Sequence, residues 1–158
     1  MGDRDRALKL FQRGYECQRS GELDDAARLY QASIAAEPTA EAYTFLGWVY
    51  SMQGRYEEAI AECKRAIGVD PAFGNPYNDI GAYLVELGRE AEAIPWFRRA
   101  MAAPRYEAPH YPHVNLARVY ERRGDLLAAL AELTRAQGRM PGDLPVLMAI
   151  RRLQARVN

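Results

Sequence analysis

The stretch that decides the fold runs from residue 43 to residue 71 and reads YTFLGWVYSMQGRYEEAIAECKRAIGVDP. Its apolar residues recur three or four positions apart on both sides of Gly54, which predicts two amphipathic helices joined at a glycine. Pro71 closes the second pattern, because proline lacks the N–H that a continuing helix needs. The stretch therefore predicts a helix–turn–helix unit, and the rest of the chain repeats it.

Four columns of small residues recur at the same intervals of 33, 34 and 36 residues. They are Gly14, Gly47, Gly81 and Ala117; Gly21, Gly54, Gly88 and Gly124; Ala26, Ala59, Ala93 and Ala129; and Ser33, Ala66, Ala100 and Ala136. Small residues in the first column let the two helices of a unit approach closely, since a larger side chain there would overpack the contact. Glycines in the second column can adopt the left-handed conformation that ends a helix. The columns predict four stacked units over residues 7–39, 40–73, 74–109 and 110–143.

These residues resemble the tetratricopeptide repeat, a unit of about 34 residues with the signature W-x2-L-G-x2-Y, then A-x3-F, then P. In the second unit the signature positions hold Tyr43, Leu46, Gly47, Tyr50, Ala59, Cys63 and Pro71. The resemblance covers about residues 7–141. It implies a single all-α domain over residues 1–158, a right-handed α-solenoid of four helix–turn–helix repeats plus a C-terminal capping helix. It also implies an adaptor or scaffold function, in which a peptide or helix of a partner protein binds in the concave groove.

The periodicity predicts helices at about 3–20, 24–37, 40–53, 56–69, 75–87, 90–103, 110–123, 126–139 and 144–157. The ninth helix has no partner, and Asp143 is a suitable residue to cap its start. Arg151 stands where the first glycine column would continue, so a further helix could not pack closely there. We expect this helix to cap the stack; a mobile helix that docks into the groove of a neighbouring copy is the alternative.

The junction between the third and fourth units is irregular. Its sequence, MAAPRYEAPHYPHVNL over residues 101–116, carries two extra residues and three prolines. A longer and stiffer connection should change the angle between the units. Two interpretations remain open, namely a tolerated loop insertion and a shaped ridge beside the groove.

The resemblance implies that the first helix of each pair lines the groove. The groove residues we predict are Phe11, Tyr15, Phe45, Trp48, Asn78, Asp79, Tyr111, Asn115 and Arg118. Exposed aromatic residues are common anchors of protein interfaces, and side-chain amides can bond a peptide backbone. We therefore expect a ligand with an apolar anchor near the first two units and a polar or acidic part near the fourth. The alternative is that Phe45 and Trp48 belong to the packing between helices.

One peptide-binding mode known in this family is excluded by the residue types. Some tetratricopeptide domains clamp the C-terminal carboxylate of a chaperone with lysines and asparagines on their inner helices. The corresponding positions of the first two units hold Phe11, Tyr15 and Phe45, and those of the third hold Asn75 and Asp79. Without a cation at these positions a carboxylate is not favoured.

Charge separates the remaining classes of function. The chain has 21 basic and 21 acidic residues, which argues against nucleic-acid capture. RNA-binding helical repeats are disfavoured further, because Glu41, Asp79, Glu86 and Glu121 fall on the inner helices. Residues 1–88 carry a net charge of −5 and residues 89–158 a net charge of +5. The alternative function is therefore a structural homo-oligomer that assembles through oppositely charged ends.

No catalytic, metal-binding or membrane signal stands out. The chain has no nucleotide-binding motif, and its only histidines, His110 and His113, have no further ligand nearby in sequence. We predict no enzyme activity, no metal, no cofactor and no membrane span. The charged N-terminus lacks an apolar signal core, which predicts a cytoplasmic protein and leaves open a leader removed from a longer product. Arginine outnumbers lysine 19 to 2, a bias associated with GC-rich bacterial genomes.

Overall fold

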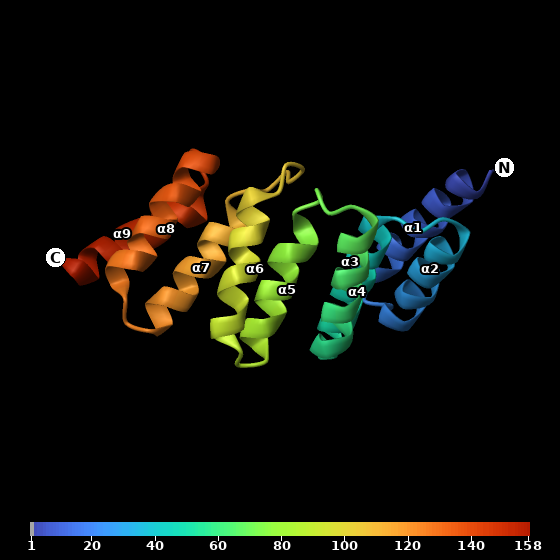
Figure 1. Cartoon of the computed structure of the whole chain (residues 1–158), viewed down its shortest axis with the longest axis horizontal. Coiled ribbons are helices and arrows are strands. Elements are labelled where there is room, and N and C mark those ends of the chain that lie inside the picture. The colour runs from blue at the N-terminus through green and yellow to red at the C-terminus, as the bar shows by residue number, and fades with distance from the viewer. Residues whose placement is uncertain (1) are drawn as a thin grey trace.

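The computed structural model describes residues 2–158, and this part of the chain folds into nine helices. They are α1 (Asp3–Arg19), α2 (Leu23–Ala36), α3 (Ala40–Met52), α4 (Tyr56–Val69), α5 (Asn75–Glu86), α6 (Glu90–Ala102), α7 (Tyr111–Arg122), α8 (Leu126–Arg139) and α9 (Leu144–Val157). Figure 1 shows them as an elongated row of helix pairs with the two termini at opposite ends. The predicted all-α solenoid is confirmed, and each helix begins and ends within one residue of the prediction.

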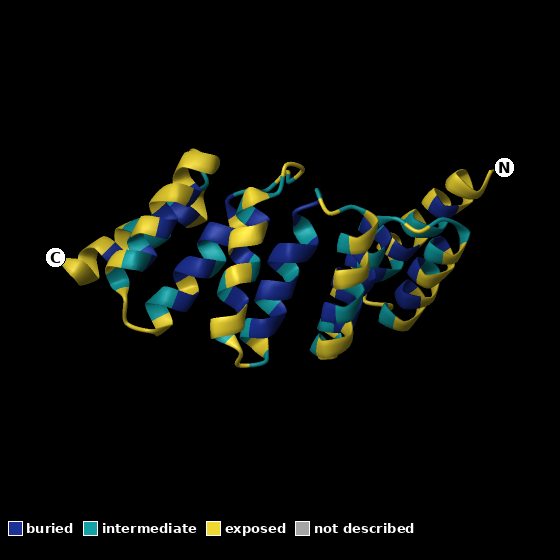
Figure 2. Ribbon diagram, in the orientation of Figure 1, coloured by how far each residue is buried: buried dark blue, intermediate teal, exposed yellow. Residues whose placement is uncertain are grey.

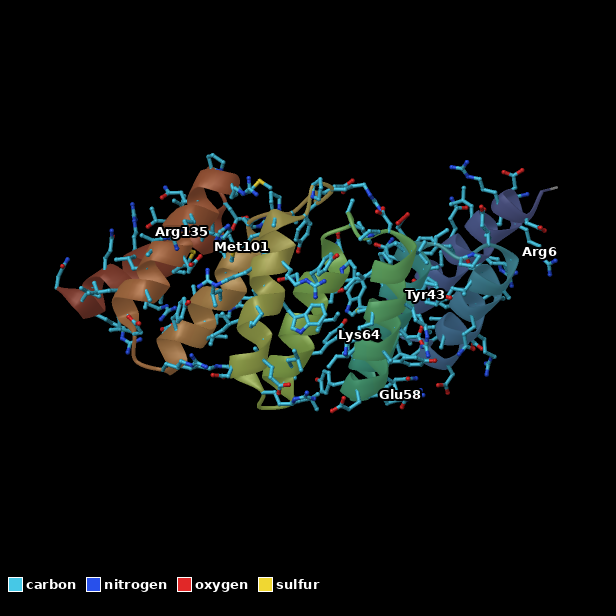
Figure 3. The ribbon with its side chains drawn as sticks, in the orientation of Figure 1. Arg6, Tyr43, Glu58, Lys64, Met101 and Arg135 are labelled. Atoms are coloured by element: carbon cyan, nitrogen blue, oxygen red, sulfur yellow. The ribbon has the colours of Figure 1, made fainter. Side chains whose placement is uncertain are left out.

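Contacts between helices follow the order of the chain, as expected for a solenoid. Each helix packs on the next one along the chain, and α3 also contacts α5, which contacts α7. The odd-numbered helices α1, α3, α5 and α7 therefore form one continuous face. The even-numbered helices carry exposed charged side chains such as Glu58, Lys64 and Arg135 (Figure 3).

The glycine columns act as the sequence predicts. A Cβ atom at Gly81 would lie 2.5 Å from Cε1 of Phe97, so only glycine lets α5 approach α6 this closely. Gly54 has a φ of 76° between α3 and α4, in the left-handed region that favours glycine. The facing alanines Ala26, Ala59, Ala93 and Ala129 are fully buried. Figure 2 shows that buried residues follow the contacts between paired helices.

The last helix is attached to the stack by an apolar contact and by ion pairs. Leu153 of α9 is fully buried against α8 and α7, and the carboxylate of Asp143 accepts a hydrogen bond from the Val146 N–H at 3.2 Å, as expected of an N-cap. Arg152 and Arg156 of α9 pair with Glu121 of α7. The C-terminal helix therefore covers the end of the α7–α8 pair.

One buried polar contact is not visible in the sequence pattern. Nδ1 of His113 on α7 lies 2.9 Å from a carboxylate oxygen of Glu132 on α8, and both residues are buried. The second oxygen of Glu132 accepts a hydrogen bond from Arg135 at 2.6 Å. This contact gives His113 a structural partner. Residues 2–158 contain no group of three His, Cys, Asp or Glu side chains arranged to hold a metal ion.

Among residues 2–158, no helix has both the length and the apolar character needed to cross a lipid bilayer.

Candidate functional site

An aromatic cluster joins the first two odd-numbered helices. Phe45 of α3 is its centre, with ring centroids 5.1 Å from Phe11, 5.8 Å from Tyr15 and 5.7 Å from Trp48. Phe11 and Tyr15 are four residues apart on α1, and Phe45 and Trp48 are three apart on α3, so each pair shares one helix face. Tyr15 and Trp48 remain 40% and 46% exposed. Packing thus orders a cluster whose outer rings are open to a partner.

A cleft of about 340 Å³ adjoins this cluster on the face of the odd-numbered helices. Its lining residues are Thr44, Phe45, Trp48 and Ser51 of α3, Asn75, Asn78, Asp79 and Tyr83 of α5, Tyr106 and Ala108 of the α6–α7 loop, and Tyr111 of α7. Three successive odd helices and one loop therefore build a single concave site. Phe45 and Trp48 belong to both the cluster and the cleft, so the two form one continuous surface.

Asp79 is the only charged residue among those that line the cleft. Its surroundings disfavour ionisation, because burial among neutral side chains raises the pKa of this carboxyl to about 7. Its negative charge in turn contributes to the raised pKa values of Tyr83 and Tyr106, whose largest cause is their own burial. Within residues 2–158, Asp79 takes part in none of the ion pairs that join acidic side chains to arginine.

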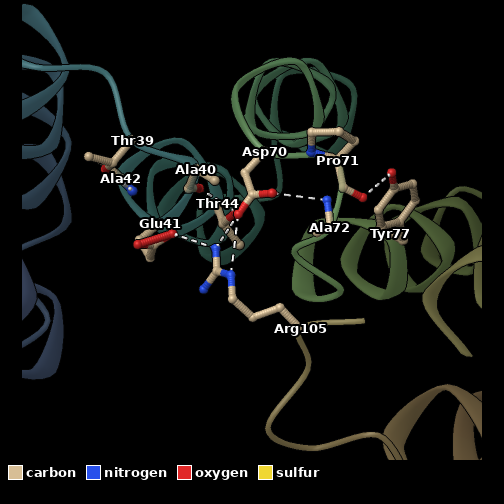
Figure 4. A network of polar contacts seen from close by, with 10 residues as sticks. All are labelled: Thr39, Ala40, Glu41, Ala42, Thr44, Asp70, Pro71, Ala72, Tyr77 and Arg105. Carbon is tan, nitrogen blue, oxygen red and sulfur yellow. Dashed lines mark hydrogen bonds and ion pairs between the residues drawn. The ribbon is translucent and has the colours of Figure 1, made fainter. Parts of the chain in front are cut away.

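The irregular junction forms one wall of the cleft. It is attached to the second repeat through Arg105 (Figure 4). The guanidinium of Arg105 donates to Asp70 at 2.7 Å and to Glu41 at 3.2 Å. This contact holds the pKa of Asp70 below its ordinary value. Backbone bonds strengthen the attachment: the N–H of Arg105 donates to the Ala72 carbonyl, and the N–H of Gly74 donates to the Arg105 carbonyl.

The bonds of Arg105 to the second repeat hold the α6–α7 loop in place and so determine the position of Tyr106. A Cβ at Gly74 would be 2.5 Å from the Tyr106 ring, so the tyrosine lies directly against the backbone at the start of α5. Figure 4 shows Arg105 reaching from the loop toward Asp70 and Glu41. Of the two interpretations of the extra residues, the structure favours a shaped ridge beside the groove.

The polar end of the predicted groove is more internally bonded than expected. Asn78 is only 8% exposed, and its Oδ1 accepts a hydrogen bond from Nδ2 of Asn115 at 3.0 Å. Oδ1 of Asn115 accepts one from Arg118 at 3.3 Å. This chain of bonds links α5 to α7 and leaves the guanidinium of Arg118 exposed. Asn78 therefore contributes more to the wall of the cleft than to a free bonding surface.

All nine predicted groove residues lie on the odd-numbered helices. Phe11, Tyr15, Phe45 and Trp48 form the aromatic cluster, while Asn78, Asp79 and Tyr111 line the cleft. Asn115 and Arg118 continue from Asn78 along α7. The cleft is also lined by six residues outside the predicted nine, namely Thr44, Ser51, Asn75, Tyr83, Tyr106 and Ala108. The two extra residues at the junction were the only available signal for Tyr106.

Two of the four acidic residues expected along the inner face, Glu41 and Glu121, are paired with arginine. Glu41 pairs with Arg105, and Glu121 pairs with Arg152 and Arg156. The carboxylate of Asp79 is thus set apart from these two by having no such cationic partner among the described residues.

Comparison with known proteins agrees with the repeat pattern. Tetratricopeptide-repeat sequence models match residues 11–75 and 110–135, which together make up more than half of the chain. The small glutamine-rich tetratricopeptide repeat-containing protein 2 of Mycosarcoma maydis is 26% identical over 97 residues. That alignment covers 61% of this chain and 28% of the relative, so the chain spans little more than a quarter of the relative's length.

Solved structures share the fold at low sequence identity. The pilF structure from Pseudomonas aeruginosa has a TM-score of 0.88 at 18% identity, over 99% of this chain and 71% of that one. YrrB, described as a tetratricopeptide protein with an unusual peptide-binding site, has a TM-score of 0.67 at 21% identity, over 95% of this chain and 77% of that one. With its glycine columns, its helix pairs and these matches, the chain belongs to the tetratricopeptide-repeat family, a family of protein–protein interaction modules.

Proposed function

We propose that the chain is an adaptor that binds a peptide or helical segment of a partner protein along the odd-numbered helices. The observation that carries this proposal is the pair of exposed rings, Tyr15 and Trp48, held on a packed aromatic cluster beside an open cleft. Side chains that are already ordered lose little conformational entropy on binding, so their contacts contribute more fully to affinity. The peptide-binding site described for YrrB is in keeping with this use of the fold.

The side chains along the odd-numbered helices suggest the order in which apolar and polar groups follow one another in the ligand. The cluster around Phe45 offers apolar contact near α1 and α3, the cleft offers a concave pocket, and Arg118 offers a cation beyond it on α7. The ligand we expect has an apolar anchor at one end and a polar or acidic group at the other. Residues Phe11, Tyr15, Phe45, Trp48, Asn78, Asp79, Tyr111, Asn115 and Arg118 form the proposed binding surface.

Replacing Trp48 with alanine should reduce partner capture by about tenfold or more, because an exposed aromatic anchor contributes at least about 2 kcal/mol to many interfaces. The measurement is affinity purification with the full chain as bait, followed by quantitative mass spectrometry. Leu127→Ala is the matched control, since Leu127 is 67% exposed on α8 and outside the proposed surface. Partners retained equally by the wild type and by Trp48→Ala would contradict binding at this face.

A second candidate function is self-assembly, and it rests on the shape and the charge of the chain. The two termini lie at opposite ends of an elongated body (Figure 1), and the halves of the sequence carry net charges of −5 and +5. A head-to-tail contact between copies would place unlike charges together and would produce rings or filaments.

Light scattering at low and high salt tests this second function. A mass that grows with protein concentration at about 20 mM salt and falls back at about 500 mM would support assembly through charged ends, because salt screens exposed charges. A constant monomer mass under both conditions would rule out assembly and would leave the adaptor proposal in place.

A further inference from the structure

The cleft between α3, α5 and α7 combines aromatic rings with a single carboxylate. Phe45, Trp48, Tyr83, Tyr106 and Tyr111 supply the rings, and they come from three helices and one loop. Trp48 and Tyr111 are 46% and 53% exposed, whereas Tyr83 is buried. A ligand would therefore pass between partly open rings on its way to the inner part of the cleft.

Within residues 2–158, the carboxylate of Asp79 has no ion-pair partner. Arg105, which belongs to the loop that walls the cleft, already bonds Asp70 and Glu41. Two other acidic residues of the inner helices, Glu41 and Glu121, each pair with arginine. The raised pKa of Asp79 has the same origin, because burial is its cause and no neighbouring cation opposes it.

Two features of the cleft favour a cation over other ligand groups. A carboxylate in partly desolvated surroundings forms strong charge-assisted hydrogen bonds with an ammonium or guanidinium group. Aromatic faces attract the same groups through cation–π contacts, which strengthen when water is excluded. An acidic ligand group would instead meet the charge of Asp79 at close range. The volume of about 340 Å³ is enough for one long side chain.

We propose that this cleft receives one basic side chain, a lysine or an arginine, of the polypeptide that occupies the groove. The proposal deepens the adaptor function and rests on it. The ligand then has three features: an apolar anchor at the Phe45 cluster, a basic residue at Asp79, and a polar or acidic group toward Arg118. Selectivity arises because a neutral side chain in the cleft would leave the carboxylate without a partner.

Selection of phage-displayed random dodecapeptides on the immobilised full chain tests the proposal. We expect enriched sequences that share lysine or arginine at one position, next to an aromatic or aliphatic residue. The same selection on Asp79→Asn should enrich peptides without that basic position. Glu16→Gln, which removes an equal charge from an exposed site on α1, should select the same peptides as the wild type.

A synthetic peptide from the selection gives the quantitative measurement. Replacing its basic residue with norleucine should raise Kd for the wild type about tenfold or more, and should change Kd for Asp79→Asn by less than about threefold. Circular dichroism of both proteins checks that the helices are intact. Free acetyl-lysine amide that binds as tightly as the peptide would overturn the assignment to a polypeptide side chain.

The outcomes of these experiments distinguish a failure of the basic-residue proposal from a failure of the adaptor function. Peptides that bind through Trp48 but show no basic position, or that are indifferent to Asp79→Asn, would overturn the inference and leave the adaptor function standing. If no peptide is enriched on the folded chain, or if enriched peptides bind equally to Trp48→Ala, both proposals fail.

Discussion

Phe97→Ala should lower the free energy of unfolding by about 3–5 kcal/mol, a large fraction of the total stability expected for a domain of this size. Phe97 of α6 is fully buried and packs against Gly81 of α5, so its removal leaves a cavity inside a helix pair. Urea denaturation followed by far-ultraviolet circular dichroism measures the loss. Leu127→Ala on α8, which removes an exposed side chain, should change stability by less than about 0.5 kcal/mol.

A double-mutant cycle shows whether the glycine column works through this contact. Gly81→Ala adds a methyl group 2.5 Å from the Phe97 ring and should cost about 1–3 kcal/mol in the wild type. In the Phe97→Ala background the methyl has room, and its helix propensity should stabilise the chain by up to about 1 kcal/mol. Gly68→Ala on α4 meets nothing within 4 Å and should be neutral or stabilising in both backgrounds. Equal costs of Gly81→Ala with and without Phe97 would show that the glycine is needed for another reason.

The helix pairs could be predicted from sequence because their determinants are local and repeat. Each unit shows its small residue at the close contact, its glycine at the turn and its proline near the end, and a repeated signal is hard to misread. The aromatic cluster followed in the same way, since Phe11, Tyr15, Phe45 and Trp48 occupy regular positions on first helices. Regular position predicts which face a residue shares, and the four rings do lie together. That they bind a partner remains a prediction.

The cleft could not be predicted because its walls depend on contacts between distant residues. Tyr106 lies in the irregular junction, and its position follows from the bond between Arg105 and Asp70, which are 35 residues apart. Asn78 was expected to offer a free amide, but its side chain is bonded to Asn115, which lies 37 residues further along the chain. Whether these two side chains meet depends on the angle between α5 and α7. Periodicity carries no information about either contact.

Asp79 illustrates the same limit for charge. Its residue type and its helix face were evident from the sequence, but the lack of a cationic partner was not. The pairing of Glu41 and Glu121 depends on arginines 64 and 31 residues away along the chain. Only the folded arrangement distinguishes a neutralised acidic side chain from one that retains an unpaired charge.

Asp79→Asn should make the chain more stable at pH 8 by about 2–4 kcal/mol and leave it almost unchanged near pH 4. The carboxyl ionises near its ordinary value of 3.8 in the unfolded chain, whereas burial raises the pKa to about 7 in the folded chain. The folded state therefore binds the proton more tightly, and stability falls as the pH rises from about 4 to about 7. Above pH 7 the destabilisation is complete. Asparagine has nearly the same size and carries no charge, so the substitution removes the destabilising charge and keeps the packing.

Urea denaturation of the wild type and Asp79→Asn at pH 4, 6 and 8 measures the effect, with Glu16→Gln as the control for loss of an exposed charge. The groups that interact with Asp79 include Tyr83, Tyr106 and Cys63, whose pKa values are all raised, so they stay uncharged throughout this range. A difference between the two proteins that is the same at every pH would show a packing effect instead. If Asp79 binds a basic side chain as proposed, saturating selected peptide should stabilise the wild type at pH 8 much more than Asp79→Asn. A residue that lowers stability in the free chain and recovers it with a ligand is explained by binding, since removing its charge would otherwise be an advantage.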